Sequence, residues 1–206
     1  MYSPYEKKPI IGIKGIIIII ILGIFIYHIN KEEVVEYGPG VKVSNEPIQN
    51  DIYLKDSFKF KGYDVEKLAS YEIEAKVLSR KDYSDMGSKF SPTDLALGWG
   101  HMSDESVLET LNISQSGRWY RWRSKTTTLP ISINEVKYSS ANTHIIPANE
   151  LVKENLKNVK KGSIIKMKGY LVKITGENGY IWKSSTTRRD SGAGACEIFY
   201  VERLDL

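Results

Sequence analysis

One apolar segment near the start of the chain constrains its structure more than any other feature. Residues 9–29 read PIIGIKGIIIIIILGIFIYHI, and this run is almost uncharged and rich in isoleucine. About 20 apolar residues in helical geometry are needed to cross the roughly 30 Å hydrocarbon core of a bilayer. The sequence therefore predicts a transmembrane helix over 9–29, with one folded domain following it.

The residues beside this segment predict how it is oriented and processed. Lys7, Lys8 and Lys14 precede the apolar core, and fewer basic residues follow it closely. The positive-inside rule then predicts a cytoplasmic tail at 1–8 and an extracytoplasmic C-terminal domain. No pair of small residues of the A-x-A kind follows the segment. This absence favours an uncleaved signal anchor in the inner, or plasma, membrane.

An alternative is a pilin-like subunit that is cleaved after Gly15. Lys14 and Gly15 precede an apolar block, as they do in prepilin-type signals. Such signals usually carry a glutamate at the position that Ile20 occupies in this chain. The uncleaved anchor is therefore the preferred prediction.

Charge and cysteine content exclude several classes of protein. The formal net charge of +4 is divided between the N-terminal segment and the remaining residues, so the predicted domain is nearly neutral. Its net charge therefore gives no reason to expect nucleic-acid binding. The single cysteine, Cys196, excludes an internal disulfide and a cysteine-based zinc cluster. Its apolar surroundings in ACEIFYV predict a buried core thiol. No cofactor is predicted.

The chain after the apolar segment divides into a linker and a domain. Residues 30–50 are charged and broken by glycines and prolines, which predicts a linker before a domain at 51–206. Residues 71–78 alternate apolar and charged side chains, as a half-buried strand does. Residues 162–172, GSIIKMKGYLV, indicate a strand bent at Gly169, and a hairpin and a closing strand follow. This pattern predicts a mainly β (α+β) fold, an OB-like small β-barrel with two or three short helices.

Local signals predict where the helices begin. Ser103 to Glu105 place carboxylates at the start of a short helix that runs to Leu111. Ser91 to Asp94 predicts another helix-entry turn. Residues 147–159 predict a helix whose apolar face is formed by Leu151, Val152, Leu156 and Val159.

Four segments stand out from ordinary strand and turn sequence. They contain the motifs DLALGWG, RWYRW, SSANTHIIPA and DSGAGACE, in this order along the domain. Together they resemble an uncharacterised family of small bacterial membrane-anchored or exported proteins that share DLALGWG, RWYxW, SSANxHxIPA and DxGxxACE. The resemblance covers residues 51–206 and implies no established activity.

The segment RWYRWR at 118–123 is the predicted binding surface. Period-two alternation places Arg118, Tyr120 and Trp122 on one face of a strand and Trp119, Arg121 and Arg123 on the other. Arginines between aromatic residues can pair with anionic groups while the rings stack on sugars or bases. Two more arginines lie in the glycine-rich loop before the last strand. The predicted binding residues are Arg118, Trp119, Tyr120, Arg121, Trp122, Arg188 and Arg189.

Enzymatic sites are weaker alternatives. A hydrolase triad can be drawn from Ser140, His144 and Asp190, but no G-x-S-x-G elbow accompanies it. His101 and His144 are the only histidines in the domain, and no H-x-x-x-H spacing holds two ligands on one element, so no metal site is predicted.

The leading hypothesis is a membrane-anchored, non-enzymatic binding or assembly module of the cell envelope. Its partner is another membrane protein, or an envelope glycan or other anionic polymer. The predicted extracytoplasmic location disfavours nucleic acid. A Ser/His hydrolase and a pilin-like subunit are the alternatives.

Overall fold

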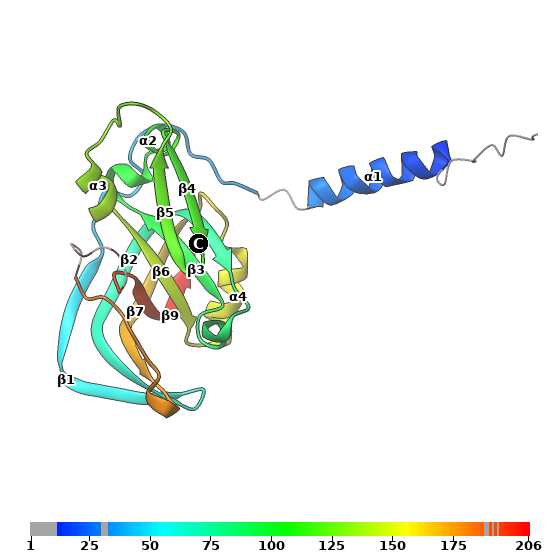
Figure 1. Cartoon of the computed structure of the whole chain (residues 1–206). Helices are drawn as coiled ribbons and strands as arrows, with labels where there is room; N and C mark the ends of the chain where they lie inside the picture. Colours follow the sequence, from blue (N-terminus) through cyan, green and yellow to red (C-terminus); the bar gives the residue numbers. More distant parts are fainter. Residues whose placement is uncertain (1–11, 30–32, 188–189, 191, 193) are drawn as a thin grey trace, which may run out of the picture. The chain divides into compact units, whose positions relative to one another are not determined.

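A computed structural model describes residues 12–29, 33–187, 190, 192 and 194–206 (Figure 1). The chain divides after Glu33 into two compact units, the N-terminal segment and a unit over Val34–Leu206. The second unit is mainly β with a large sheet, which confirms the predicted fold class at that level.

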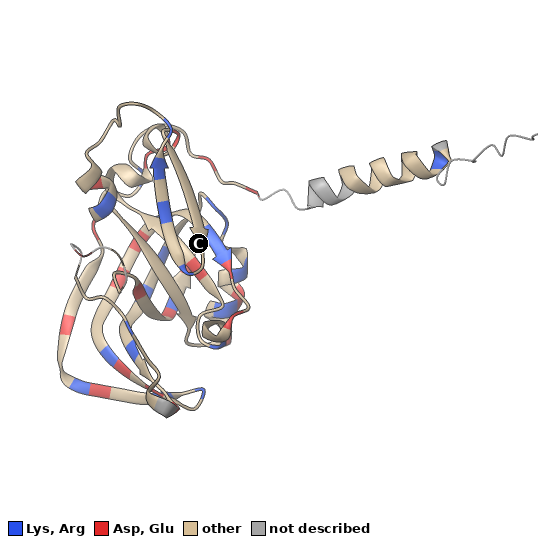
Figure 2. Ribbon diagram, in the orientation of Figure 1, with Lys and Arg blue, Asp and Glu red and all other residues tan. Residues whose placement is uncertain are grey.

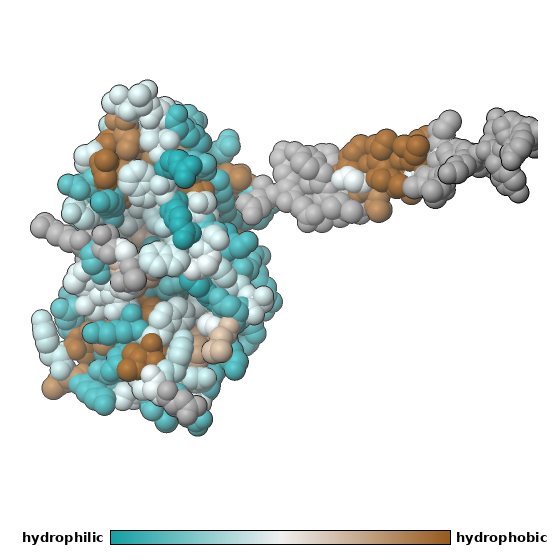
Figure 3. All heavy atoms as spheres, viewed as in Figure 1, coloured by the Kyte–Doolittle hydropathy of each residue, from teal (hydrophilic) through white to brown (hydrophobic). Residues whose placement is uncertain are grey.

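The N-terminal segment contains one helix, α1 (Ile13–Ile29). The isoleucines at 16–21 are each about half exposed or more, and Figure 3 shows apolar atoms along this part of the helix. Within the described parts of the chain, no helix is both long and apolar enough to cross a bilayer. The first residues of the predicted span, 9–11, and the predicted tail at 1–8 lie outside the described residues.

The second unit is built on a seven-stranded sheet with the order β1-β2-β3-β6-β9-β7-β8. β2 also pairs with β7, so the pairings of β2, β3, β6, β9 and β7 return to their starting strand. β6 and β9 are parallel, and the other neighbours are antiparallel. The strands are β1 (Ile48–Phe60), β2 (Tyr63–Asp82), β3 (Thr93–Gly98), β6 (Ser140–Pro147), β7 (Ile164–Thr175), β8 (Ile181–Lys183) and β9 (Glu197–Asp205).

The alternation predicted for residues 71–78 places one face of β2 in the main core. Tyr71, Ile73 and Val77 are each no more than 1 % exposed, and they pack with side chains of β3, β6, β7 and β9. The Tyr71 ring meets Phe199 edge-on with centroids 4.9 Å apart, an arrangement that adds roughly 1 kcal/mol beyond area burial. The bend predicted at Gly169 coincides with a register shift between β7 and β9. A Cβ at Gly169 would lie 2.0 Å from the Tyr200 carbonyl oxygen, so only glycine fits this close approach.

Helix α4 (Glu150–Asn158) connects β6 to β7. It begins at Glu150, three residues after the predicted start, because the Asn149 side chain caps it by accepting a hydrogen bond from Val152 N. Val152 and Leu156 are buried, but Leu151 is 70 % exposed. The apolar face of this helix is therefore narrower than the sequence predicted.

The connection from β3 to β6 carries a separate β-hairpin, β4 (Leu111–Ser116) and β5 (Trp119–Ser124). Its inward side chains Ile113, Tyr120 and Trp122 pack with Leu78 and Ala96 of the large sheet. Three short helices flank the hairpin: η2 (Gly100–Ser103) and α2 (Glu105–Leu108) precede it, and α3 (Ile133–Tyr138) follows it. Two more lie in connections of the large sheet, η1 (Met86–Lys89) between β2 and β3 and η3 (Glu177–Gly179) between β7 and β8.

Two predictions from the sequence are corrected by the structure. Ser91 to Asp94 does not open a helix, because Thr93 and Asp94 belong to β3 and pair with both β2 and β6. Pairing on both sides satisfies this backbone, which overrides the local turn preference. Residues 34–47 were predicted as linker but lie against the domain: Val43 is 3 % exposed, and its backbone N–H donates to Ser103 Oγ at 3.0 Å.

Candidate functional site

A pair of buried ionisable side chains lies on the face of β3 and β6 that points away from the main core. Asp94 and His144 are directly opposite each other in the antiparallel register of these strands. Their neighbours Leu95 and Ile145 point into the core, so Asp94 and His144 point to the other face. His144 Nδ1 lies 2.9 Å from Asp94 Oδ1, and the two side chains are only 4 % and 0 % exposed.

Arg118 joins this pair from the turn of the β4–β5 hairpin. Its Nη1 donates to Asp94 Oδ1 at 2.7 Å, and its Nη2 donates to Asp85 Oδ1 at 2.6 Å. These donors hold the pKa of Asp85 below its usual range, although burial acts in the opposite direction. The guanidinium also stacks over the Tyr83 ring at 4.1 Å. Arg118 is thus an internal cross-link rather than part of an exposed binding face.

The backbone at Arg118 is strained in order to make these contacts. Ser116 pairs with Trp119, so Gly117 and Arg118 form a two-residue hairpin loop. Both have positive φ angles, 58° and 69°, as the favoured hairpin turns require. A non-glycine residue in this region costs roughly 1–2 kcal/mol. The ion pairs with Asp85 and Asp94 offset that cost.

Cys196, the single cysteine of the chain, is a second interaction partner of His144. His144 forms an ion pair with Asp94 and also interacts with Cys196. Burial lowers the pKa of the imidazole, but the hydrogen bonds and the charges of these two partners outweigh burial and raise the pKa to about 9. His144 is therefore protonated at neutral pH. The Trp182 ring covers the imidazole with a centroid distance of 4.9 Å.

Cys196 is held by a second polar contact. Asn142 Nδ2 donates to Cys196 Sγ at 3.5 Å and to the Arg118 carbonyl at 3.0 Å. Gln115 Nε2 in turn donates to Asn142 Oδ1 at 2.9 Å, which fixes the orientation of the amide. Cys196 itself is partly exposed, so the prediction of a buried core thiol is corrected. We call Asp94, Asn142, His144 and Cys196 the thiol cluster.

A cavity of about 190 Å³ opens beside the thiol cluster. Cys196 and Asn142 line it from the sheet side, and Trp119, Tyr120 and Trp122 line it from the hairpin. Burial raises the pKa of Tyr120 to about 12, so its hydroxyl remains protonated. The cavity therefore combines aromatic walls with a sulfur atom and an amide donor.

The outward face of the hairpin is the part of the predicted binding surface that reaches solvent. Trp119 is 40 % exposed, and Arg121 and Arg123 are also exposed, whereas Tyr120 and Trp122 are half-buried on the other side. From Trp119 to Arg123, exposed and half-buried side chains alternate along β5, as the sequence predicted. Figure 2 shows the basic residues along β5, where Arg121 and Arg123 are opposite Ser114 and Asn112 of β4. Arg188 and Arg189, also predicted to bind, lie outside the described residues.

The predicted hydrolase residues have separate partners. Ser140 Oγ donates to the Val136 carbonyl at 2.6 Å, and Asp190 accepts from Ser185 Oγ at 2.6 Å. His144 pairs with Asp94 and Cys196 instead. Of the three predicted residues, only His144 belongs to the thiol cluster.

His101, the other histidine of the domain, has a different partner. Its Nδ1 pairs with Glu135 Oε1. In the part of the chain that the structure describes, no group of three histidine, cysteine or acidic side chains is placed to hold a metal ion.

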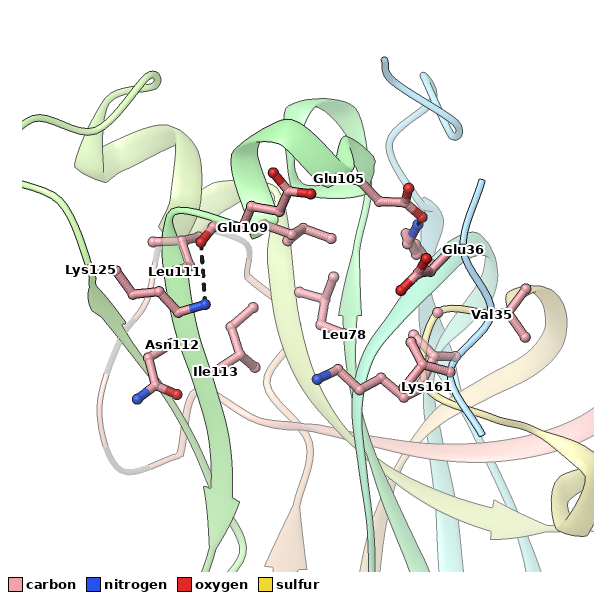
Figure 4. Close-up of a pocket in the computed structure, with 15 residues that line it drawn as sticks. Val35, Glu36, Leu78, Glu105, Glu109, Leu111, Asn112, Ile113, Lys125 and Lys161 are labelled. Carbon is pink, nitrogen blue, oxygen red and sulfur yellow. Dashed lines mark hydrogen bonds and ion pairs between the residues drawn. The ribbon is translucent and has the colours of Figure 1, made fainter. Parts of the chain in front are cut away.

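A second cavity, of about 290 Å³, lies between β2, β4 and the segment that begins at Val34 (Figure 4). Leu78, Leu108 and Ile113 form its apolar wall. Charged side chains surround it, and one pair of them, Lys76 Nζ and Glu105 Oε1, is 2.6 Å apart with the lysine buried. Lys125 Nζ also donates to the Glu109 carbonyl at 3.2 Å.

No protein-family model, curated protein or solved structure matches this chain. The family resemblance of the four motifs stays a prediction. Three of the motifs nevertheless supply the thiol cluster, namely Asp94 in DLALGWG, Asn142 and His144 in SSANTHIIPA, and Cys196 in DSGAGACE. Sequence reasoning missed the cluster because its members are far apart in the chain. One signal was present: a lone aspartate inside the apolar strand DLALG is expensive to bury without a charged partner.

Proposed function

We propose that this protein is a membrane-anchored binding module of the cell envelope, with an OB-like barrel as its binding domain. Five strands, β2, β3, β6, β7 and β9, support the OB-like assignment because their pairings close on themselves. In OB-folds, ligands bind across the face of the second and third strands and the loops beside it. In this chain those strands are β3 and β6, whose outer face carries the thiol cluster and its cavity.

The observation that carries this proposal is the exposed face of β5 at the rim of that cavity. Trp119 lines the cavity and is 40 % exposed, and Arg121 is exposed two residues further along the strand. An exposed indole stacks on sugar rings, and a guanidinium pairs in a planar, bidentate manner with carboxylates and phosphates. The ligand that fits these two groups is an anionic glycan or related polymer of the envelope. A membrane-protein partner is the alternative.

The proposed location rests on the apolar segment. An anchor at 9–29 with a cytoplasmic tail would place the domain outside the inner membrane, where such polymers are found. Intact-mass measurement of the mature protein tests the anchor: a chain that begins at Ile16 would replace it with the pilin-like alternative.

Binding is tested with the full-length protein in mild detergent and isolated envelope polymer. We expect Trp119→Ala and Arg121→Ala each to weaken cosedimentation by about tenfold, since a stacking contact contributes roughly 1–3 kcal/mol. Arg203→Ala is the matched control, because Arg203 is an exposed arginine on β9 that pairs with Asp205. Equal binding by all three variants would contradict the proposal. Stoichiometric copurification of a membrane protein, lost in the same two variants, would establish the alternative partner.

A further inference from the structure

The thiol cluster has the parts of a nucleophilic centre. We propose that Cys196 is a catalytic nucleophile that accepts an acyl group from an ester or amide bound in the adjacent cavity, with His144 as its acid–base partner. Asp94 Oδ1 lies 2.9 Å from Nδ1 of the imidazole, and Cys196 is a second interaction partner of the same side chain. This inference goes beyond the proposed binding role, does not depend on it, and replaces the expected non-enzymatic module with a chemical step.

Burial argues against a purely structural role for these residues. Asp94 and His144 are almost completely buried, and Arg118 adds a third charge to the same group. Replacing a buried ion pair by well-packed apolar residues is often neutral or stabilising, so such a group adds little to stability for its cost. Cys196, by contrast, is a partly exposed residue and lines the cavity. The buried charged residues are therefore connected to one partly exposed residue with a nucleophilic side chain, Cys196.

The charge state of His144 suits this chemistry. An imidazolium beside a cysteine favours the thiolate, which is the reactive form of the side chain. The groups that face the imidazole are the Asp94 carboxylate, the Cys196 sulfur and the Trp182 ring. Arg118 reaches it only through Asp94. A nucleophile, a base and a group that orients the base are thus joined in one chain of contacts, as in acyl-transfer enzymes on unrelated folds.

Asn142 supplies the donor that acyl transfer needs. Its Nδ2 lies 3.5 Å from the sulfur, and Gln115 fixes the amide so that the nitrogen faces Cys196. When the sulfur attacks a carbonyl carbon, the carbonyl oxygen becomes negatively charged close to the sulfur. A side-chain amide in this place stabilises that charge, and removing such a donor costs about a hundredfold or more in rate.

The proposed step needs only these side chains, the bound ester or amide, and water. It starts from an ion pair in which the proton lies on His144 and the Cys196 sulfur is a thiolate. Sγ bonds to the carbonyl carbon, and the carbonyl electron pair moves to oxygen. Collapse of this intermediate breaks the bond to the leaving group, which takes the proton from His144, and a thioester on Cys196 remains. Water then attacks the thioester and gives a proton to His144, and the acid departs, which restores the thiolate and the protonated His144.

The cavity limits the acyl group that can enter. Its volume is about 190 Å³, and three aromatic side chains line it, so a small acyl group fits better than a long chain. We therefore choose p-nitrophenyl acetate as the probe, with the full-length protein in mild detergent. The chain has one cysteine, so a thioester can form at Cys196 alone. We expect an acetyl adduct that hydroxylamine removes and that Cys196→Ser lacks.

Acylation of Cys196 can be tested with the wild-type protein alone. A hydroxylamine-sensitive adduct supports the proposal, and its absence in protein whose thiol is readily alkylated by iodoacetamide would overturn it. Two variants then assign the roles. His144→Gln should slow both alkylation and acylation at least tenfold, whereas His101→Gln, the matched control on a partly exposed histidine, should change neither.

Asn142→Ala separates a positioning role from a merely structural one. Alkylation by iodoacetamide develops no oxyanion, so this variant should alkylate at close to the wild-type rate while its acetylation falls about a hundredfold. Equal loss in both reactions would mean that Asn142 only supports the local structure, and it would remove the oxyanion contact from the proposal. Circular dichroism of each variant confirms that the domain is folded.

Discussion

The molecule contains two sets of cross-strand ion pairs that differ in one respect, their burial. On the outer face of β2 and β7, lysines and glutamates oppose each other in register, as in Lys166–Glu74 and Lys168–Glu72, with N–O distances of 3.3 and 3.5 Å. On the outer face of β3 and β6, Asp94 opposes His144 at 2.9 Å. The first set is largely exposed, and the second is covered by Trp182 of β8 and by Arg118 in the turn of the β4–β5 hairpin.

This difference decides what each face can do. Water screens the exposed pairs and competes for their charges, so each contributes between 0 and about 1 kcal/mol. The covered face has little water, so its charges depend on one another, and the pKa of His144 rises to about 9. A covered, charged face can hold a reactive group, whereas an exposed one mainly keeps the protein soluble. Four measurements test whether the two faces differ in this way.

The largest effect is expected from Asp94→Asn. The substitution keeps the shape of the side chain but leaves Arg118 and His144 without their shared anion. Breaking a buried pair in this way typically costs about 3–5 kcal/mol, and we expect a loss of that size in the free energy of unfolding. Urea unfolding of the full-length protein in detergent measures it. A loss of less than about 1 kcal/mol would mean that this face is as well hydrated as that of β2 and β7.

The next effect is a dependence of stability on pH. The pKa of His144 is 6.5 in the unfolded chain and about 9 in the folded protein, so the folded state binds the proton more tightly. The resulting stabilisation, roughly 3 kcal/mol, is fully present below pH 6.5 and is lost as the pH rises through about 9. Unfolding free energies measured at pH 6 and pH 9.5 test this. His144→Gln should remove most of the difference, and an unchanged difference in that variant would assign it to another group.

A smaller effect is expected from Trp122→Ala. Trp122 is half-buried between the hairpin and the sheet, and its loss should cost about 2 kcal/mol, less than a fully buried tryptophan. Because the indole also lines the cavity, the variant should expose Cys196 and speed its alkylation. Trp119→Ala, on the outward face of the same strand, is the control and should change the stability by less than about 0.5 kcal/mol. Similar losses in both variants would show that the hairpin does not act as a one-sided cover.

The smallest effect is expected on the exposed face. Lys168→Met removes one partner of the pair with Glu72, whose side chains are 68 % and 56 % exposed. We expect the free energy of unfolding to change by less than about 0.5 kcal/mol. The difference between wild type and variant should also vary by less than this amount between low and high ionic strength. Thermal unfolding at low and high ionic strength measures it. A loss above 1 kcal/mol would place these pairs among the interactions that hold the two strands together.

Much of the local structure was predictable because it depends on neighbouring residues. The period-two pattern of 71–78 and of RWYRWR depends only on the pleat of a strand, which places alternate side chains on opposite faces. The cap of α2 is of the same kind: Asp104 accepts from Ser106 N within a single turn. The bend at Gly169 was predictable from a glycine inside a strand pattern.

The candidate site was not predictable in this way. Asp94 and His144 are 50 positions apart in the sequence, and only the pairing of β3 with β6 places them in contact. The same holds for Cys196, whose apolar neighbours predicted a buried core thiol. Those neighbours, Ile198 and Phe199, are indeed buried, while Cys196 itself precedes β9 and lines the cavity.

The apolar N-terminal segment, the mainly β class of the domain and the two faces of β5 follow from the amino-acid sequence, since each depends on composition or on the spacing of nearby residues. Three features depend on the folded chain: which charged residues are buried together, the role of Arg118 as an internal cross-link, and the proximity of Cys196 to a protonated histidine. Burial and electrostatic coupling depend on distances through space, which strand pairing sets and sequence separation does not.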